Sequence, residues 1–307
     1  MDTLIIEKKN EVYITVDCDP NIQREISEFF TFYVPGYKFM PAFRNRMWDG
    51  KIRLYSQKTK EIYFGLYPYI IAFAKERGYH IVSGKDVEVD NKVNKEVVTK
   101  FSNSLGQKFE ARDYQIDAIY HSLKYNRALL LSPTASGKSF IIYSLIRYYS
   151  HLIKDEPNNR ILLIVPTTSL VEQMYSDFQS YGWNVKKNCH RLYSGYSNQT
   201  DKKVLISTWQ SLYKLPKKYF EQFGVVFGDE AHLFKSKSLT EIMTKLEDCK
   251  YRIGLTGTLD GAQTHKLVLE GLFGAVNKVT STRKLMDKQQ LSNLVVRCLI
   301  LKHTIEN

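Results

Sequence analysis

Residues 132–139 read Ser-Pro-Thr-Ala-Ser-Gly-Lys-Ser, a combination of small residues, a lysine and a hydroxyl side chain that suits phosphate binding. The segment follows a short apolar run that ends at Leu131, which predicts a strand, a tight loop and then the first turn of a helix. In that arrangement backbone N–H groups point at phosphate oxygens, and we expect Lys138 to reach the same phosphates while the Ser139 hydroxyl reaches Mg²⁺. The octapeptide therefore predicts a nucleoside triphosphate site.

Two positions of this loop depart from the usual P-loop pattern. Ser132 replaces the first glycine, and Ala135 stands where many related loops have another glycine. Because a side chain disfavours a positive backbone φ, these residues argue against a left-handed backbone at both positions. Gly137 and Lys138, which the pattern demands most strictly, are present.

A second polar cluster, Asp-Glu-Ala-His at 229–232, follows another apolar run about ninety residues farther along the chain. The carboxyl ends of parallel strands meet at one edge of a sheet, so we expect Asp229 and Glu230 to enter the cleft that holds the P-loop. Either motif alone has an ordinary explanation, because Gly-Lys-Ser is common by chance and an Asp-Glu pair is usually a solvated turn. Their order and their flanking apolar runs together indicate nucleotide hydrolysis.

The composition is that of a folded protein with a polyanionic partner. The 307 residues suffice for about two domains, and a hydrophobic content of 43% is ordinary. The formal charge of +12 favours a polyanion, although a basic balance also serves solubility. Basic and aromatic residues interleave in one segment, which contains Lys38, Arg44, Arg46, Lys51, Arg53, Lys58 and Lys60 together with Tyr37, Phe39, Phe43, Trp48 and Tyr55.

The sequence shows no targeting or membrane segment. Residues 1–10 lack a continuous apolar core of signal-peptide length, and the strongest apolar runs, such as 161–165, have the length of strands. The four cysteines form no Cys-x-x-Cys pair, so neither a zinc site nor a disulfide framework is indicated; they are Cys18, Cys189, Cys249 and Cys298. We expect a cytoplasmic protein with reduced cysteines.

Residues 1–100 predict a small α+β domain. The patterns predict, in chain order, a strand at 12–16, a helix at 20–32, strands at 52–54 and 62–64, and a helix at 69–77 that Gly78 ends. Residues 86–108 are rich in charge, Asn and Ser and have weak hydrophobic patterning. We therefore place the domain boundary in that stretch, between residues 100 and 101.

From Arg112 onward, strands alternate with helical patterns, which predicts an α/β lobe at 101–282 with a parallel sheet covered by helices on both faces. The expected strands lie at about 128–132, 161–165, 203–207, 224–228 and 251–255. Helices are expected to begin near Asp113, Lys138, Ser169, Trp209 and Lys237. Residues 271–280 look irregular, 283–290 predict a short helix, and 293–301 alternate like a new strand, so 283–307 is interpreted as a linker and the start of a further lobe.

Six short motifs occur in an order that resembles the superfamily 2 helicases. They are Arg-Asp-Tyr-Gln at 112–115, the P-loop, Pro-Thr-Thr-Ser-Leu at 166–170, Ser-Thr-Trp-Gln-Ser-Leu at 207–212, Asp-Glu-Ala-His at 229–232 and Thr-Gly-Thr at 256–258. The resemblance covers about half of the chain and implies a RecA-like first lobe. Gly-Tyr-Lys-Phe at 36–39, with Trp-Asp-Gly-Lys-Ile-Arg-Leu at 48–54, is also similar to the phage UvsW-type recombination and repair helicases.

The resemblance implies that these motifs bind ATP and Mg²⁺. Gln115 would read the adenine edge, because an amide offers one donor and one acceptor, although taken alone it is an ordinary exposed helix residue. The other nucleotide-binding positions would be Arg112, Thr134, Ala135, Ser136, Gly137, Lys138 and Ser139. Ser139 with Asp229 would hold Mg²⁺, Lys138 would neutralise the phosphates, and Glu230 would orient or deprotonate the attacking water.

Other motif residues would connect the nucleotide to DNA. The coupling residues would be His232, Thr256 and Thr258, and the residues on the phosphate backbone of one strand would be Thr167, Thr208 and Gln210. Each group has an ordinary alternative. His232 could be a structural histidine, and Thr167 and Thr208 could be plain helix N-caps.

The basic aromatic segment has two interpretations. Arg44, Arg46, Lys51 and Arg53 would contact the phosphates of duplex or forked DNA, with some aromatic residue exposed for base stacking. Alternatively, the segment is a solvated basic hairpin whose aromatic residues build the core of the small domain. The two interpretations are compatible if the basic and aromatic residues occupy different faces.

We expect an ATP-dependent DNA helicase or translocase that acts on forks, Holliday junctions or R-loops. The preference for branched DNA rests only on the UvsW-type resemblance. An RNA helicase is an alternative, since Asp-Glu-Ala-His occurs there too, and a non-catalytic nucleic-acid-binding fragment is another. A superfamily 2 enzyme needs a second lobe with Gln-x-x-Gly-Arg-x-x-Arg, which this sequence lacks, so we expect that lobe beyond residue 307. The expected location is the cytoplasm, that of the host cell if the protein is phage-encoded.

Overall fold

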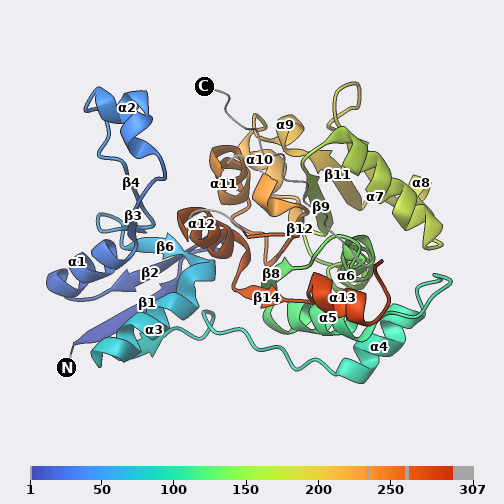
Figure 1. The fold of residues 1–307 in the computed structure, drawn as a ribbon, viewed down its shortest axis with the longest axis horizontal. Coiled ribbons are helices and arrows are strands. Elements are labelled where there is room, and N and C mark those ends of the chain that lie inside the picture. Colours follow the sequence, from blue (N-terminus) through green and yellow to red (C-terminus); the bar gives the residue numbers. More distant parts are fainter. Residues whose placement is uncertain (1, 234–235, 260–262, 293–307) are drawn as a thin grey trace, which may run out of the picture.

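The computed structural model describes residues 2–233, 236–259 and 263–292, and it contains a small N-terminal unit beside a larger unit (Figure 1). The larger unit is built on a parallel sheet and the smaller one mixes helices with a mostly antiparallel sheet, so the predicted fold class is confirmed. Among the described residues, no helix has the length and apolar character needed to cross a membrane.

The N-terminal unit is built on a five-stranded sheet in the order β5-β6-β2-β1-β7. Its strands are β1 (Thr3–Lys8), β2 (Tyr13–Asp17), β5 (Tyr55–Ser56), β6 (Glu61–Tyr63) and β7 (His80–Ser83), and its helical segments are α1 (Pro20–Phe29), η2 (Phe64–Leu66) and α3 (Tyr67–Arg77). Helix α1 begins after Asp19, whose side chain accepts a hydrogen bond from the Asn21 N–H. Helix α3 ends at Gly78 as predicted, because a φ of +71° there suits glycine.

A two-stranded ribbon projects from this unit, and we call residues 31–53 the arm. Strand β3 (Thr31–Tyr33) pairs antiparallel with β4 (Lys51–Arg53), and the far end carries η1 (Tyr37–Phe39) and α2 (Pro41–Arg44). Figure 1 shows α2 standing well away from both sheets. The part of the predicted basic segment up to Arg53 therefore lies in a projection, whereas Tyr55 is buried in the core of the N-terminal sheet.

The larger unit contains a seven-stranded sheet in the order β10-β11-β9-β12-β13-β8-β14, in which every strand pair is parallel. The strands are β8 (Arg127–Leu131), β9 (Arg160–Val165), β10 (Cys189–Leu192), β11 (Val204–Thr208), β12 (Phe223–Gly228), β13 (Tyr251–Thr256) and β14 (Val276–Lys278). The central strands are continuous apolar runs because helices cover both faces of the sheet. All five predicted strands are confirmed.

The helices of this unit precede, connect or follow its strands. They are α4 (Lys95–Asn103), α5 (Asp113–Tyr125), α6 (Lys138–Leu152), α7 (Thr168–Ser180), α8 (Val185–Asn188), α9 (Trp209–Leu212), α10 (Lys217–Phe220), η3 (Ala231–Leu233), α11 (Ser236–Lys245), α12 (Gln263–Phe273) and α13 (Thr282–Asp287). The predicted helix starts and the short helix near 283–290 are confirmed. The strand expected at 293–301 lies outside the described residues, as does Cys298; Cys18, Cys189 and Cys249 are free thiols.

One prediction about these elements was wrong, and one helix was not predicted. Residues 271–280, expected to be irregular, contain the end of α12 and strand β14, which is too short for its periodicity to be visible. Residues 86–108, where the sequence indicated a domain boundary and no helix, contain α4, which Asn94 caps and which buries Val98 against the core of the larger unit. The proposed boundary at 100 and 101 falls inside α4, so we propose that the division between the units precedes Asn94.

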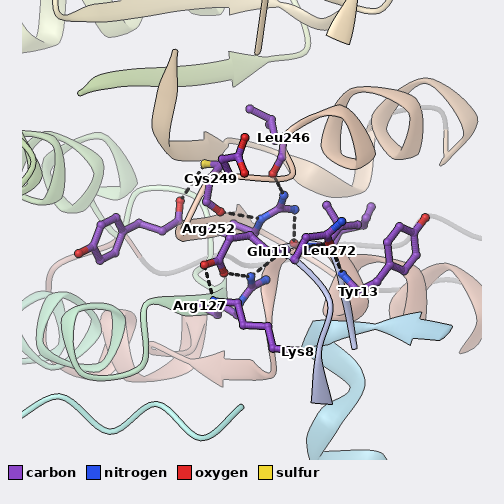
Figure 2. Close-up of polar contacts among 12 residues, drawn as sticks. Lys8, Glu11, Tyr13, Arg127, Leu246, Cys249, Arg252 and Leu272 are labelled. Atoms are coloured by element: carbon purple, nitrogen blue, oxygen red, sulfur yellow. Dashed lines mark hydrogen bonds and ion pairs between the residues drawn. The ribbon is translucent and has the colours of Figure 1, made fainter. Parts of the chain in front are cut away.

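The two units meet through a buried polar contact (Figure 2). Arg127, the first residue of β8, donates to the carbonyl oxygen of Glu11 at 2.5 Å and to its Oε2 at 2.9 Å. The Arg127 guanidinium also lies 4.3 Å from the ring centre of Phe64. The neighbouring Arg252 is fully buried and donates to the carbonyl groups of Cys249, Met243, Leu246 and Leu272. Because β8 leads directly into the P-loop, the N-terminal unit is anchored to the strand that positions the candidate site.

Candidate active site

The P-loop connects β8 to α6 with its backbone held by serine hydroxyl groups. Ser132 Oγ lies 2.6 Å from Ser136 Oγ, which donates to the Pro133 carbonyl at 2.6 Å. Gly137 has a φ of +80°. The expectation for Ala135 was wrong, because it adopts a φ of +63° despite its Cβ, whereas Ser132 avoids the positive region as expected. The loop therefore keeps a left-handed turn at Ala135 at a cost in strain.

Lys138 and Glu230 form an ion pair at the centre of the site. Lys138 Nζ lies 2.8 Å from Glu230 Oε1 and 3.4 Å from the Ser132 carbonyl oxygen. Glu230 Oε2 accepts from the Gly257 N–H at 3.4 Å, and Glu230 itself has a φ of +48°. The two side chains are mostly shielded, at 11% and 21% exposure, so the pair is screened less than a surface pair.

Asp229 follows β12 and is buried with an unsatisfied oxygen. Its side chain is 2% exposed, and Oδ1 has no hydrogen-bond partner among the described residues. Burial raises the pKa of Asp229 to about 7; the neighbouring Glu230 charge adds to the shift and Lys138 opposes it. An unpaired buried carboxylate oxygen suits a hard divalent cation, so Asp229 fits Mg²⁺, and the Ser139 hydroxyl is an oxygen ligand of the same chemical class.

Ser139 interacts with two residues that the sequence did not indicate. Its Oγ lies 2.9 Å from the Tyr181 hydroxyl. The Ser139 hydroxyl also opposes the rise in pKa that burial causes at the Asp177 carboxyl. Tyr181 follows the last turn of α7, and no local pattern pairs it with a residue 42 positions earlier.

Gln115 and Arg112 lie against the P-loop. Gln115 Nε2 donates to the Ser136 carbonyl at 3.0 Å, and its Oε1 accepts from the Arg112 N–H at 3.0 Å. A Cβ on Gly137 would lie 2.3 Å from Gln115 Nε2, so any other residue at this position would displace the Gln115 amide in addition to straining the positive φ. Tyr114 adds a hydrogen bond to the same carbonyl at 3.1 Å. Gln115 is thus buried and not an exposed helix residue, and contact with a base would require its amide to exchange partners.

Thr134 and Ala135, two of the expected nucleotide-binding residues, form the exposed tip of the P-loop.

The expected coupling residues adjoin Glu230. His232 Nδ1 lies 2.7 Å from Thr256 Oγ1 and 3.5 Å from Glu230 Oε2. Thr256 Oγ1 donates to the Thr258 carbonyl at 2.7 Å. The end of β13 is thereby connected to the glutamate through one histidine.

The expected DNA-backbone residues differ in access. Thr167 is exposed and caps α7, accepting a hydrogen bond from the Leu170 N–H at 3.3 Å. Thr208 is buried, 3.1 Å from Ser211 Oγ, whereas Gln210 is exposed. The structure therefore offers Thr167 and Gln210 to a partner more readily than Thr208.

The arm exposes basic side chains over its own aromatic cluster. Tyr37 stacks on Tyr33 with ring centres 4.8 Å apart and contacts Phe43 edge-on, so these aromatic residues do not build the core of the N-terminal sheet. The basic residues Arg44, Arg46 and Arg53 are exposed and Lys51 is half-buried. Arg53 pairs with Asp49, and the Lys51 ammonium lies 4.9 Å from the Tyr33 ring centre. Phe39 is 76% exposed.

A family described as "Type III restriction enzyme, res subunit" has a model that matches residues 108–261, half of the chain. The chain belongs to this family of superfamily 2 helicases. A second family, described as "DNA helicase UvsW, N-terminal", matches residues 6–84. Both expected resemblances are thereby confirmed, and the superfamily 2 match covers all the residues from the Arg-Asp-Tyr-Gln motif to the Thr-Gly-Thr motif.

Among the relatives of this superfamily 2 chain are two longer proteins. The ATP-dependent DNA helicase UvsW of Enterobacteria phage T4 is 34% identical over 304 residues, which cover 96% of this chain and 59% of that protein. A DNA 3′–5′ translocase, XPB2, of Sulfurisphaera tokodaii is 26% identical over 155 residues, which cover 49% of this chain and 31% of that protein. The chain spans less than two thirds of the length of both relatives.

The crystal structure of the UvsW helicase from bacteriophage T4 has the same fold. It matches with a TM-score of 0.81 and 32% identity over 91% of this chain and 100% of the crystallised one.

Proposed function

We propose that the chain is the N-terminal part of an ATP-dependent DNA helicase or translocase that remodels branched DNA. The observation that carries the proposal is the convergence of Lys138, Asp229 and Glu230 at the carboxyl ends of β8 and β12, with Asp229 Oδ1 left unpaired. Membership of the superfamily 2 helicases supports the same chemistry.

Lys138 would bind the β- and γ-phosphates after leaving Glu230, and Ser139 with Asp229 would hold Mg²⁺. Bound Mg²⁺ supplies charge neutralisation on the phosphate oxygens. Glu230 would then orient the attacking water and accept its proton. Gln115 and Arg112, together with Thr134, Ala135, Ser136 and Gly137, would position the rest of the nucleotide.

DNA is the proposed partner because the named relatives are a DNA helicase and a DNA translocase. Thr167 and Gln210 would contact one strand, and His232, Thr256 and Thr258 would link that contact to Glu230. The arm would contact phosphates through Arg44, Arg46, Lys51 and Arg53, and the preference for branched DNA rests on the similarity to UvsW. An RNA helicase and a non-catalytic binding fragment are the competing functions.

We also propose a second RecA-like lobe in the full-length protein, since both relatives are longer than this chain. That lobe would complete the cleft and supply an arginine finger, which is worth about 10³ to 10⁵ in rate for enzymes of this type. The protein would act in the cytoplasm, that of the host cell if it is phage-encoded.

The test is phosphate release by the full-length protein with forked DNA, linear duplex or RNA. We expect stimulation by DNA, strongest with forks, and none in Lys138→Ala. Stimulation by RNA alone would replace the proposal with the RNA helicase. Nucleic-acid binding without hydrolysis would replace it with the binding fragment.

A further inference from the structure

Helix α7 connects two parts of the candidate machinery that lie at its opposite ends. Its N-cap is Thr167, which is exposed and belongs to the proposed DNA contact. Beyond its last turn stands Tyr181, 2.9 Å from Ser139 Oγ in the first turn of α6. The 13 residues of α7 span about 20 Å at 1.5 Å per residue, so one rigid element reaches from the DNA surface to the P-loop serine.

The Ser139 hydroxyl has two possible sets of partners. In the structure it faces α7, where it contacts the Tyr181 hydroxyl at 2.9 Å. Asp229, with which it would share a cation, meanwhile keeps a buried oxygen without a partner among the described residues. An unsatisfied buried oxygen is costly, so the arrangement is poised to change when a cation gives Ser139 and Asp229 a common partner.

We propose that Tyr181 is a positioning residue that holds the Ser139 hydroxyl toward α7 and away from the cation site until DNA binding at the other end of α7 releases it. The inference rests on the proposed function, because it assigns Ser139 to Mg²⁺ and Thr167 to DNA. Displacement of α7 by DNA would separate Tyr181 from Ser139. If DNA binding increases the affinity for Mg²⁺-nucleotide, then Mg²⁺-nucleotide must increase the affinity for DNA by the same factor, because coupling between two binding sites is reciprocal.

The test compares Tyr181→Phe with the full-length wild-type protein by titration of a fluorescent, non-hydrolysable ATP analogue. The substitution removes the hydroxyl and keeps the ring that packs on Phe140 and Tyr143. Without DNA and with Mg²⁺, we expect affinity to rise roughly 2- to 12-fold, the range that one hydrogen bond allows. In EDTA we expect no change, because only the cation site gains a ligand.

DNA supplies the second half of the test. Forked DNA should raise the affinity of the wild-type protein for the Mg²⁺-analogue. The rise caused by DNA should be smaller in Tyr181→Phe, by the same factor by which Tyr181→Phe exceeds the wild type in the absence of DNA. Tyr175→Phe is the matched control, since it lies on the same helix and no hydrogen bond of its hydroxyl occurs in the described part of the chain. Its ring contacts Arg191 and its titration should match the wild type.

The outcomes separate the inference from the function on which it rests. If the wild-type protein binds no Mg²⁺-analogue, or if DNA does not change that affinity, the proposed function or its DNA coupling fails. If the wild-type protein shows both and Tyr181→Phe behaves like Tyr175→Phe, the proposed function stands and the role of Tyr181 is wrong. A lower affinity in Tyr181→Phe, or an equal gain in EDTA, also overturns it.

Discussion

Lys138 Nζ lies 2.8 Å from Glu230 Oε1, so the lysine assigned to phosphate binding is paired with the carboxylate assigned to water activation. Nucleotide phosphates must compete with this carboxylate for the ammonium group. Glu230 also lies beside His232, which in turn contacts the Thr256 hydroxyl. Nucleotide binding would therefore free Glu230 at the moment when its role begins.

Glu230→Gln should abolish hydrolysis while keeping or improving nucleotide affinity. The amide cannot accept the proton of the attacking water, and it removes a negative charge that competes with the phosphates for Lys138. Phosphate release and titration with a fluorescent nucleotide check the two parts. Lys138→Ala should lose both. Hydrolysis at the wild-type rate in Glu230→Gln would remove the site assignment.

The free energy of unfolding should fall as the pH rises from the ordinary pKa of Asp229 to its raised pKa in the folded protein. Burial raises the pKa of Asp229 to about 7, against 3.8 as its ordinary value. Between these two pH values the folded state keeps a proton that the unfolded state has released. Stability at pH 8 therefore carries the full cost of a buried carboxylate, whereas stability at pH 4 does not. Asp229→Asn should raise the melting temperature more at pH 8 than at pH 5.5. An equal difference at both pH values would contradict the shift.

The same shift gives a second, functional pH dependence. In the proposed site Mg²⁺ would need the carboxylate form of Asp229, so apparent Mg²⁺ affinity should increase about tenfold per pH unit below 7 and level off above it. Asp229→Asn should bind Mg²⁺-nucleotide weakly at every pH. Titration of Mg²⁺ against bound fluorescent nucleotide measures this dependence.

The sequence predicted those parts of the site that lie on single contiguous motifs. The run before Leu131 and the motif at 229–232 each identify a strand end, and parallel topology brings strand ends together. Contacts across distant segments left no local trace: Tyr181 meets Ser139 only because α6 packs on α7, and Glu11 meets Arg127 across 116 positions. Helix α4 was missed because its exposed polar residues outnumber the few that it buries. The φ of Ala135 was mispredicted because the loop tolerates local strain at a functional position.

Glu11→Gln should destabilise the protein by about 3–5 kcal/mol, because it leaves the buried Arg127 guanidinium without a counter-charge. Urea denaturation gives the free energy of unfolding. Lys9→Ala is a suitable control, since its pair with Glu61 involves an exposed lysine and should contribute little to stability. Equal effects of the two substitutions would show that the contact between the units is not energetically important.

The arm should account for part of the salt dependence of DNA binding. If the four basic side chains at 44, 46, 51 and 53 each neutralise a phosphate, their replacement by alanine should flatten the slope of log affinity against log salt by roughly 0.9 per contact on duplex DNA. Binding should weaken for all sequences alike, and hydrolysis without DNA should persist.

A smaller variant allows a charge-matched control. Arg44→Ala/Arg46→Ala should flatten the slope by roughly 1.8. Lys186→Ala/Lys187→Ala removes the same charge from exposed positions of α8, at the opposite end of the molecule from α2 in Figure 1, and should change the slope little. The same slope in both double variants would make the arm a solvated basic surface.

The most direct test of the account is strand separation or branch migration of a forked DNA by the full-length protein, measured with ATP, with a non-hydrolysable analogue, and with Glu230→Gln. The account predicts processing by the wild-type protein with ATP alone, and DNA binding without processing in the other two cases. Processing by Glu230→Gln at the wild-type rate would show that Glu230 does not activate the attacking water. A wild-type protein that hydrolyses ATP but never remodels a fork, or that acts on RNA instead, would contradict the proposed function.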